Sequence, residues 1–108
     1  MLIYEVNLTI DLAIIEDFKV WLKEHMQEVV KLGGFEKAQL FSRENDCELT
    51  VHYHVKDRAT LDAYLKNHAP RLREEGLKRF PNQFSATRRV LLSIYPSRVV
   101  PEPSPELV

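Results

Sequence analysis

The sequence predicts an α+β domain of the ferredoxin-like type, with the element order βαββαβ and a four-stranded antiparallel sheet. The chain has 108 residues, which fits one domain. Four segments alternate apolar and polar residues with the period of a half-buried strand, and two longer segments have the period of a helix. Because crossovers between strands are right-handed, this order favours the sheet order 4-1-3-2 with both helices on one face.

The first third of the chain is expected to form a strand and then a helix. Residues 2–10 alternate strictly, so one face of that strand is apolar and the other mostly polar. Asp11 is expected to cap the helix, whose apolar stripe runs from Ile14 to Leu32. The pair Gly33-Gly34 then ends it, since glycine adopts the left-handed conformation at little cost.

The middle of the chain predicts a β-hairpin. Residues 35–43 return to a period of two, and residues 48–56 alternate most clearly of all. The polar pair Asn45-Asp46 lies between the two runs and supplies a turn.

The last third predicts a second helix and a fourth strand. Asp57 is a suitable cap for that helix, and Pro70 should kink or split it near Ala69, because proline has no amide hydrogen to donate. Residues 84–95 form the last strand, with Val90, Leu92 and Ile94 expected on one side. We therefore predict a ferredoxin-like domain over residues 1–95 and a proline-rich C-terminal tail over 96–108, without a core of its own.

The composition narrows the function classes. The hydrophobic share of 44% and the charged share of 29% are those of a globular protein. A net charge of −1 argues against nucleic acid and anionic membranes as partners, since both favour a basic surplus. The single cysteine, Cys47, excludes an intrachain disulfide, and neither a signal peptide nor a long apolar run is present. We expect a cytoplasmic protein with no membrane span.

The face of the sheet away from the helices mixes apolar and titratable side chains. Antiparallel sheets can leave one face in water, but apolar walls with a few convergent polar groups are also what a ligand cavity needs. The polar groups that we expect to bind a ligand there are Glu5, Asn7, His52, His54 and Arg89.

Several segments of the chain resemble known families. Residues 30–38 and 56–68 resemble the dimeric α/β-barrel superfamily, which includes antibiotic-biosynthesis monooxygenase-like and haem-degrading proteins. Residues 1–95 as a whole are most similar to a small bacterial family of unknown function, on segments 3–8, 21–26, 68–73 and 84–89. The resemblance implies a homodimer whose two sheets pack face to face into an eight-stranded barrel. It implies no activity, because the superfamily hosts unrelated reactions.

His52 and His54 offer a weak metal-site hypothesis. Residues two apart on a strand share a face, so both imidazoles could reach one ion, with Glu5 or Asn7 as a third ligand. The alternative, which we favour, is that both histidines only line a polar cavity. We therefore expect no bound metal and no other cofactor.

The resemblance also permits a check for haem degradation. Haem-degrading members use an asparagine, a tryptophan and a histidine, and Asn7 and His68 match the first and, loosely, the third. Val55 and Lys56 stand where the tryptophan should be, which argues against this activity. A cofactor-independent monooxygenase would use Asn7 and a histidine to polarise its substrate, but no nucleophile or base stands out. Whether the protein is an enzyme stays open.

The remaining candidates have a structural alternative that we favour. Trp21 and His25, one helical turn apart, could form a pocket edge, but we favour a core tryptophan beside a histidine at the boundary of the core. Arg88 and Arg89 could bind an anion, or one could pair with a carboxylate across the sheet. A run of mixed charges follows Pro70 and is typical of a solvated helix face; it contains Arg71, Arg73, Glu74, Glu75, Lys78 and Arg79.

Two functional hypotheses remain. In the first, the protein binds or transforms a small organic ligand in a cavity between the two sheets of the dimer. In the second, it is a non-catalytic interaction module whose sheet face serves only assembly.

Overall fold

The structure is a computed structural model that describes residues 1–94. Its strands are β1 (Leu2–Ile10), β2 (Lys37–Ser42), β3 (Glu48–Val55) and β4 (Phe84–Leu92). They form one sheet in the order β2-β3-β1-β4, and every neighbouring pair is antiparallel. The predicted α+β ferredoxin-like fold and its strand order are confirmed.

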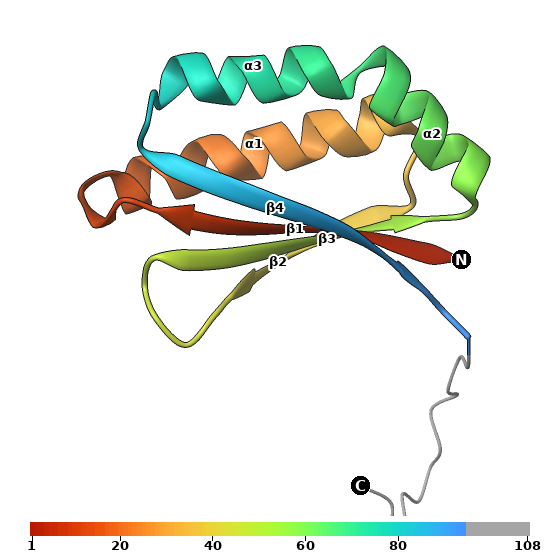
Figure 1. Cartoon of the computed structure of the whole chain (residues 1–108), viewed down its shortest axis with the longest axis horizontal. Helices are drawn as coiled ribbons and strands as arrows, with labels where there is room; N and C mark the ends of the chain where they lie inside the picture. Colours follow the sequence, from red (N-terminus) through yellow and green to blue (C-terminus); the bar gives the residue numbers. More distant parts are fainter. Residues whose placement is uncertain (95–108) are drawn as a thin grey trace, which may run out of the picture.

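The helices cover one face of this sheet (Figure 1). They are the short 3-10 helix η1 (Leu12–Ile14) and the α-helices α1 (Ile15–Gly33), α2 (Arg58–Asn67) and α3 (Ala69–Arg79). The other face carries no helix, so the two faces of β1 and β3 lie in different surroundings (Figure 1). Within residues 1–94, no helix is both long enough and apolar enough to cross a membrane.

The predicted break in the second helix is confirmed. The Asp57 carboxylate accepts a hydrogen bond from the Thr60 backbone N–H at 2.8 Å and begins α2. Pro70 lies in the first turn of α3, where its missing N–H costs no helical hydrogen bond. The helical segment is therefore two helices that meet at His68.

The prediction that Asp11 caps the first helix is wrong. Its side chain makes no capping hydrogen bond; instead its backbone carbonyl accepts from the Ile14 N–H at 3.1 Å. That bond closes a 3-10 turn, so α1 begins only at Ile15.

Two residues have backbone angles in the left-handed region of φ/ψ space, and both lie where the chain changes direction. Gly34 (φ 64°) ends α1, as predicted. Asn82 (φ 57°) lies in the turn between α3 and β4, and asparagine tolerates this conformation better than most side chains do. The turn fixes which residues of β4 face the helices.

The core lies between the sheet and the helices. The strand residues that point to the helices are almost all buried, among them Tyr4, Val6, Leu8, Leu49, Val51, Tyr53 and Val55. Phe18 of α1, Leu61 of α2 and Leu72 of α3 face them with no exposed surface. Burial of this apolar area is the main source of the domain's stability.

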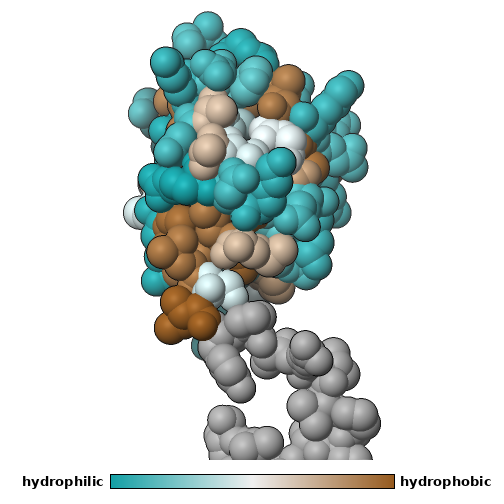
Figure 2. All heavy atoms as spheres, turned by 90° about the vertical axis from the view of Figure 1, so that its right-hand side faces the viewer, coloured by the Kyte–Doolittle hydropathy of each residue, from teal (hydrophilic) through white to brown (hydrophobic). Residues whose placement is uncertain are grey.

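The end of β4 departs from the predicted pattern. The strand ends at Leu92, and Tyr95 and the predicted tail lie outside the described residues. The alternation places Leu92 and Ile94 on the side of Val90, but they are 66% and 93% exposed, because this end of the chain runs away from the helices (Figure 1). Figure 2 shows apolar surface gathered at this end of the molecule, where Met1 is also exposed.

Candidate functional site

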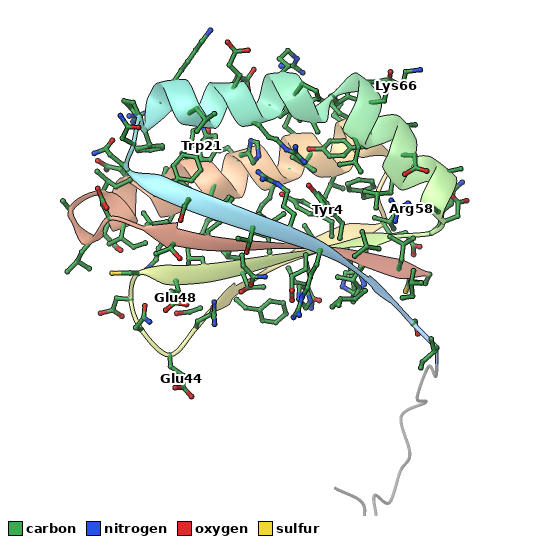
Figure 3. The ribbon with its side chains drawn as sticks, in the orientation of Figure 1. Tyr4, Trp21, Glu44, Glu48, Arg58 and Lys66 are labelled. Carbon is green, nitrogen blue, oxygen red and sulfur yellow. The ribbon has the colours of Figure 1, made fainter. Side chains whose placement is uncertain are left out.

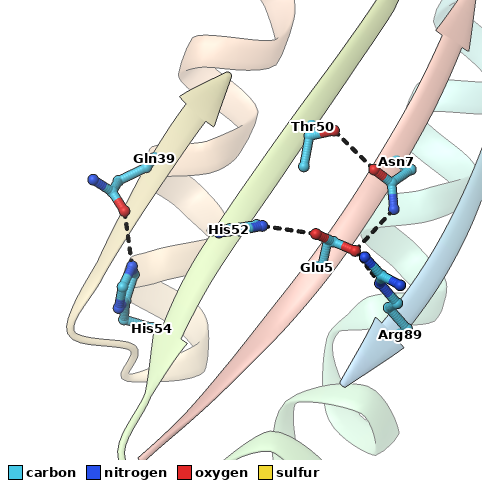
Figure 4. Close-up of polar contacts among 7 residues, drawn as sticks. All are labelled: Glu5, Asn7, Gln39, Thr50, His52, His54 and Arg89. Atoms are coloured by element: carbon cyan, nitrogen blue, oxygen red, sulfur yellow. Dashed lines mark hydrogen bonds and ion pairs between the residues drawn. The ribbon is translucent and has the colours of Figure 1, made fainter. Parts of the chain in front are cut away.

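Glu5 is the centre of a polar network on the open face of the sheet (Figure 4). In the sheet register Glu5 lies opposite His52 on one neighbouring strand and Arg89 on the other. Its carboxylate accepts a hydrogen bond from the Arg89 guanidinium, and its Oε1 lies 2.8 Å from His52 Nε2. The Asn7 amide donates to the same carboxylate at 3.1 Å. Three of the predicted ligand-binding groups therefore bind the fourth, Glu5.

The network stabilises the charged form of Glu5. The side chain is only 7% exposed, which by itself would raise its pKa. The hydrogen bond from Arg89 outweighs this burial, and with those from His52 and Asn7 it lowers the Glu5 pKa to about 2. Glu5 is thus ionised at neutral pH and forms an ion pair with Arg89.

The other open-face candidates also have protein partners. The Thr50 hydroxyl donates to the Asn7 amide oxygen at 2.7 Å. His54 Nε2 lies 2.9 Å from Gln39 Oε1, so the two histidines turn to different partners (Figure 4). Within residues 1–94, no group of three or more His, Cys, Asp or Glu side chains is placed to hold a metal ion.

Trp21 and His25 lie on the other side of the sheet and are both half-buried. Their rings stack with centroids 4.5 Å apart, and Trp21 also contacts the rings of Phe18 and Phe80. In Figure 3, Trp21 and Tyr4 both lie in the layer between the helices and the strands. The structure thus combines the two interpretations offered for Trp21: the ring packs on the core and also forms the wall of a cavity.

This helix-side cavity has a volume of about 260 Å³. Aromatic and aliphatic side chains from α1, α3, β1, β3 and β4 form most of its wall. Its polar groups come from Tyr4, His25, Tyr53, Tyr64, Arg73, Ser85 and Arg88, and none of the residues that line it is acidic.

Arg73 and Arg88 bring positive charge to the helix-side cavity. Arg73, expected on a solvated helix face, donates a hydrogen bond to the Tyr4 hydroxyl at 3.0 Å. Arg88 lies opposite Val6 in the register and so points to the helix side, whereas Arg89 points to the open face. Within residues 1–94 neither Arg73 nor Arg88 forms an ion pair, and both residues are exposed at the mouth of the cavity wall that they help to form.

Burial favours the neutral forms of Tyr53, Tyr64 and His25 in the helix-side cavity. Burial raises the pKa of the Tyr53 hydroxyl far above its ordinary value and raises the pKa of Tyr64 to about 12. Burial also lowers the pKa of His25; the nearby charge of Glu75 opposes this effect and that of Arg88 adds to it. The cavity therefore offers phenol and imidazole groups beside two cations.

A shallower hollow on the open face provides a contrast. It is lined by Asn7, Arg43, Thr87, Arg88 and Arg89. Two of its arginines are already paired, Arg43 with Glu48 at 2.8 Å and Arg89 with Glu5. The third arginine, Arg88, lines both this hollow and the helix-side cavity and has no ion-pair partner within residues 1–94. Two of the three cations of the hollow are therefore paired with protein carboxylates, whereas neither arginine of the helix-side cavity is.

His68 lies at the junction of α2 and α3, and its ring is tilted against that of Tyr64 at 6.4 Å. It does not line the helix-side cavity.

The sequence pattern did not identify Arg73 or the cavity tyrosines as site residues. A run of mixed charges predicts a solvent-exposed helix face, and the apolar face of a strand predicts residues of the packed core.

The comparisons with known proteins agree with this fold. Residues 1–94 match the model of a family described as a domain of unknown function, DUF4286. No curated protein matches the chain.

Solved structures of the same fold are similar to nearly the whole chain. SnoaB from Streptomyces nogalater, described as a cofactor-independent oxygenase, has a TM-score of 0.68 at 13% identity over 94% of this chain and 98% of its own. A structure described as an antibiotic biosynthesis monooxygenase has a TM-score of 0.61 at 16% identity, over 89% and 100%. A dimeric ferredoxin-like protein from an uncultured marine organism has a TM-score of 0.58 at 17% identity, over 89% and 96%. These likenesses confirm the predicted fold resemblance; identities this low show nothing further.

Proposed function

The chain belongs to the DUF4286 family, a domain of unknown function, and from this premise we propose that it binds a small organic molecule in the helix-side cavity. The observation that carries the proposal is a cavity of about 260 Å³ whose aromatic wall adjoins two arginines without a carboxylate partner among residues 1–94. Apolar walls with a few polar groups are the usual composition of small-molecule sites.

This location differs from the one expected between two sheets. The open-face groups Glu5, Asn7 and His52 are occupied by one another, so a ligand there would have to replace bonds that already exist. A ligand in the helix-side cavity would displace solvent and would compete with one protein hydrogen bond, the bond from Arg73 to the Tyr4 hydroxyl. The cavity between two sheets concerns a second copy of the chain and stays a prediction.

The proposal is one of binding, without a chemical step. SnoaB is described as an oxygenase, but Asn7, the residue that the sequence offered for polarising a substrate, lies on the open face, where Glu5 and Thr50 hold its side chain. We also propose that the protein is located in the cytoplasm, as expected from its composition.

A thermal-shift screen of metabolites tests the binding site. Ala86 of β4 lines the helix-side cavity, so Ala86→Phe should fill it, whereas Ala59→Phe makes the same change at an exposed position of α2. A true ligand should stabilise the wild type and Ala59→Phe but not Ala86→Phe, with circular dichroism confirming that each variant is folded. A ligand that stabilises all three proteins equally would place the site elsewhere.

We also propose that the open face pairs with the same face of a second copy. One neighbour of similar fold is described as dimeric. The open face carries Phe41, which is 41% exposed, and the half-buried Ile3 and Leu91, and such apolar groups favour burial.

Sedimentation velocity at micromolar concentration tests the dimer. We expect a dimer for the wild type and a shift to monomer for Phe41→Glu, while Leu77→Glu, at an exposed position of α3, should stay dimeric. A monomeric wild type would contradict the proposal. A dimer for which no cavity ligand is found would favour the other hypothesis, a module that serves only assembly.

A further inference from the structure

We propose that the ligand of the helix-side cavity is an organic acid, with one carboxylate placed between Arg73 and Arg88 and an apolar body of about one or two rings against Trp21. This inference rests on the proposed binding function and adds the chemical class of the ligand. Charge, hydrogen-bonding capacity and volume support it separately.

The charges around the helix-side cavity favour an anion. Arg73 enters from α3 and Arg88 from β4, and no acidic residue lines the cavity. Two acids outside the lining act on its titratable groups: the charge of Glu75 raises the pKa of His25, and that of Glu28 raises the pKa of Tyr64. Glu75 is itself paired with Arg71 at 2.7 Å, which leaves the two cavity arginines in excess.

The hydrogen-bonding groups of the helix-side cavity are mainly donors. Among residues 1–94, Tyr53 and Tyr64 have no hydrogen-bond partner for their hydroxyls, and no fully buried side-chain polar atom is left without a partner. These two hydroxyls therefore keep some accessible surface, although both residues are almost fully buried, and both residues line the cavity. Phenols that stay protonated donate hydrogen bonds, as guanidinium groups do, and a carboxylate accepts from both.

The shape of the helix-side cavity favours a carboxylate on a compact apolar body. A dry apolar cavity of about 150 Å³ is enough for benzene, and here the volume is about 260 Å³. The Trp21 ring forms one wall, and Gly76 lies against it, because a Cβ at that position would come within 2.9 Å of the ring. The absence of a side chain at Gly76 lets α3 approach Trp21 and close that end of the cavity.

The charge can be tested with matched acids and amides. We choose phenylacetate, 3-phenylpropionate and 2-naphthoate, each compared with its neutral amide of the same shape. Trp21 is the only tryptophan of the chain and lines the cavity, so its fluorescence reports binding there. Isothermal titration gives the affinities independently. For at least one pair we expect the wild type to bind the acid about tenfold more tightly than the amide.

Substitutions then assign the preference to the two arginines. Arg88→Gln and Arg73→Gln should each weaken acid binding about tenfold and leave amide binding unchanged, whereas Arg88→Lys should restore much of the preference. Arg58→Gln, at an exposed arginine of α2 that pairs with Asp62, is the matched control and should change neither affinity. Thermal melts confirm that each variant is folded.

The outcomes separate this inference from the function on which it rests. Equal binding of acid and amide by the wild type would overturn the organic-acid proposal but leave the binding function intact. An acid preference that survives both arginine-to-glutamine variants would also overturn it. No Trp21 response to any of the six compounds at millimolar concentration would contradict both proposals.

Discussion

The charged groups on the two faces of the sheet have opposite surroundings, although residues of the two faces alternate along the same strands. On the open face, Glu5 gathers Arg89, His52 and Asn7 into a closed set of bonds. On the helix side, Arg73 and Arg88 approach a cavity with no carboxylate beside it. The open face carries more polar groups, yet the helix side has more unused binding capacity. The number of titratable residues on a surface therefore identifies a ligand site less well than the number left without partners.

The largest difference between the faces should appear in apolar packing. Phe18→Ala should lower the free energy of unfolding by about 3–5 kcal/mol, because the ring is fully buried among Trp21, Phe80 and Phe84. Phe41→Ala, on the open face, should cost less than about 1 kcal/mol in the monomer. Urea unfolding of both variants at equal protein concentration measures the contrast, and similar losses would show that Phe41 is buried in solution.

The next largest effect concerns the charge of Glu5. Glu5→Gln keeps the shape but loses the charge, and we expect it to destabilise the fold by about 1–2 kcal/mol at pH 7, a modest loss since Arg89 can turn to water. The folded pKa of about 2 lies below the ordinary value of 4.5, so the stabilisation by the carboxylate is complete above about pH 5. It is lost as the pH falls toward 2. The difference between wild type and variant should shrink over this range in urea titrations; a constant difference would contradict the ion-pair account.

A single neutral hydrogen bond on the open face should have a smaller effect. Thr50→Val removes the hydroxyl that donates to Asn7 and leaves the amide oxygen without that partner in a nearly buried place. We expect a loss of about 1 kcal/mol in the free energy of unfolding. Thermal unfolding monitored by circular dichroism measures it, and an unchanged midpoint would mean that water replaces the hydroxyl.

The smallest effect belongs to the corresponding change on the helix side. Tyr4→Phe removes the hydroxyl that accepts from Arg73, but Arg73 is exposed and water can replace that bond. We expect a cost below about 0.5 kcal/mol, together with unchanged or tighter binding of the acid probes, because Arg73 loses a competing partner. Weaker acid binding would show that the Tyr4 hydroxyl positions Arg73.

Much of the fold could be predicted from local pattern. The alternation of residues 2–10 and 48–56 places Tyr4 and Tyr53 toward the helices and Glu5 and His52 away from them, as the register shows. Pro70 splits the helical segment because the chemistry of proline is local. Asp11 misled the prediction because a 3-10 turn competes with a side-chain cap for the same first residues, and the sequence does not say which forms.

The site was harder to predict, because it depends on which residues meet. The pairing of one arginine with a carboxylate across the sheet was among the alternatives, and Glu5 and Arg89 realise it. No periodic pattern in the sequence indicates the helix-side cavity. Its walls are residues that any amphipathic pattern assigns to the core, and Arg73 reaches Tyr4 across 69 positions of sequence. Only the spacing between helix and sheet decides whether such residues pack closely or leave room.

The number of residues that follow the left-handed turn at Asn82 determines which side chains of β4 lie on each face of the sheet. Arg88 and Arg89 are consecutive in β4, and the distance of each from this turn determines which face it serves. Inserting one residue between Asn82 and Arg88 would place Arg88 opposite Glu5 and Arg89 opposite Tyr4 on the helix side. Deleting one residue there would place Val90 opposite Glu5 and Arg89 opposite Val6, so the carboxylate would lose its arginine partner. This short segment should therefore tolerate changes of side chain far better than changes of length.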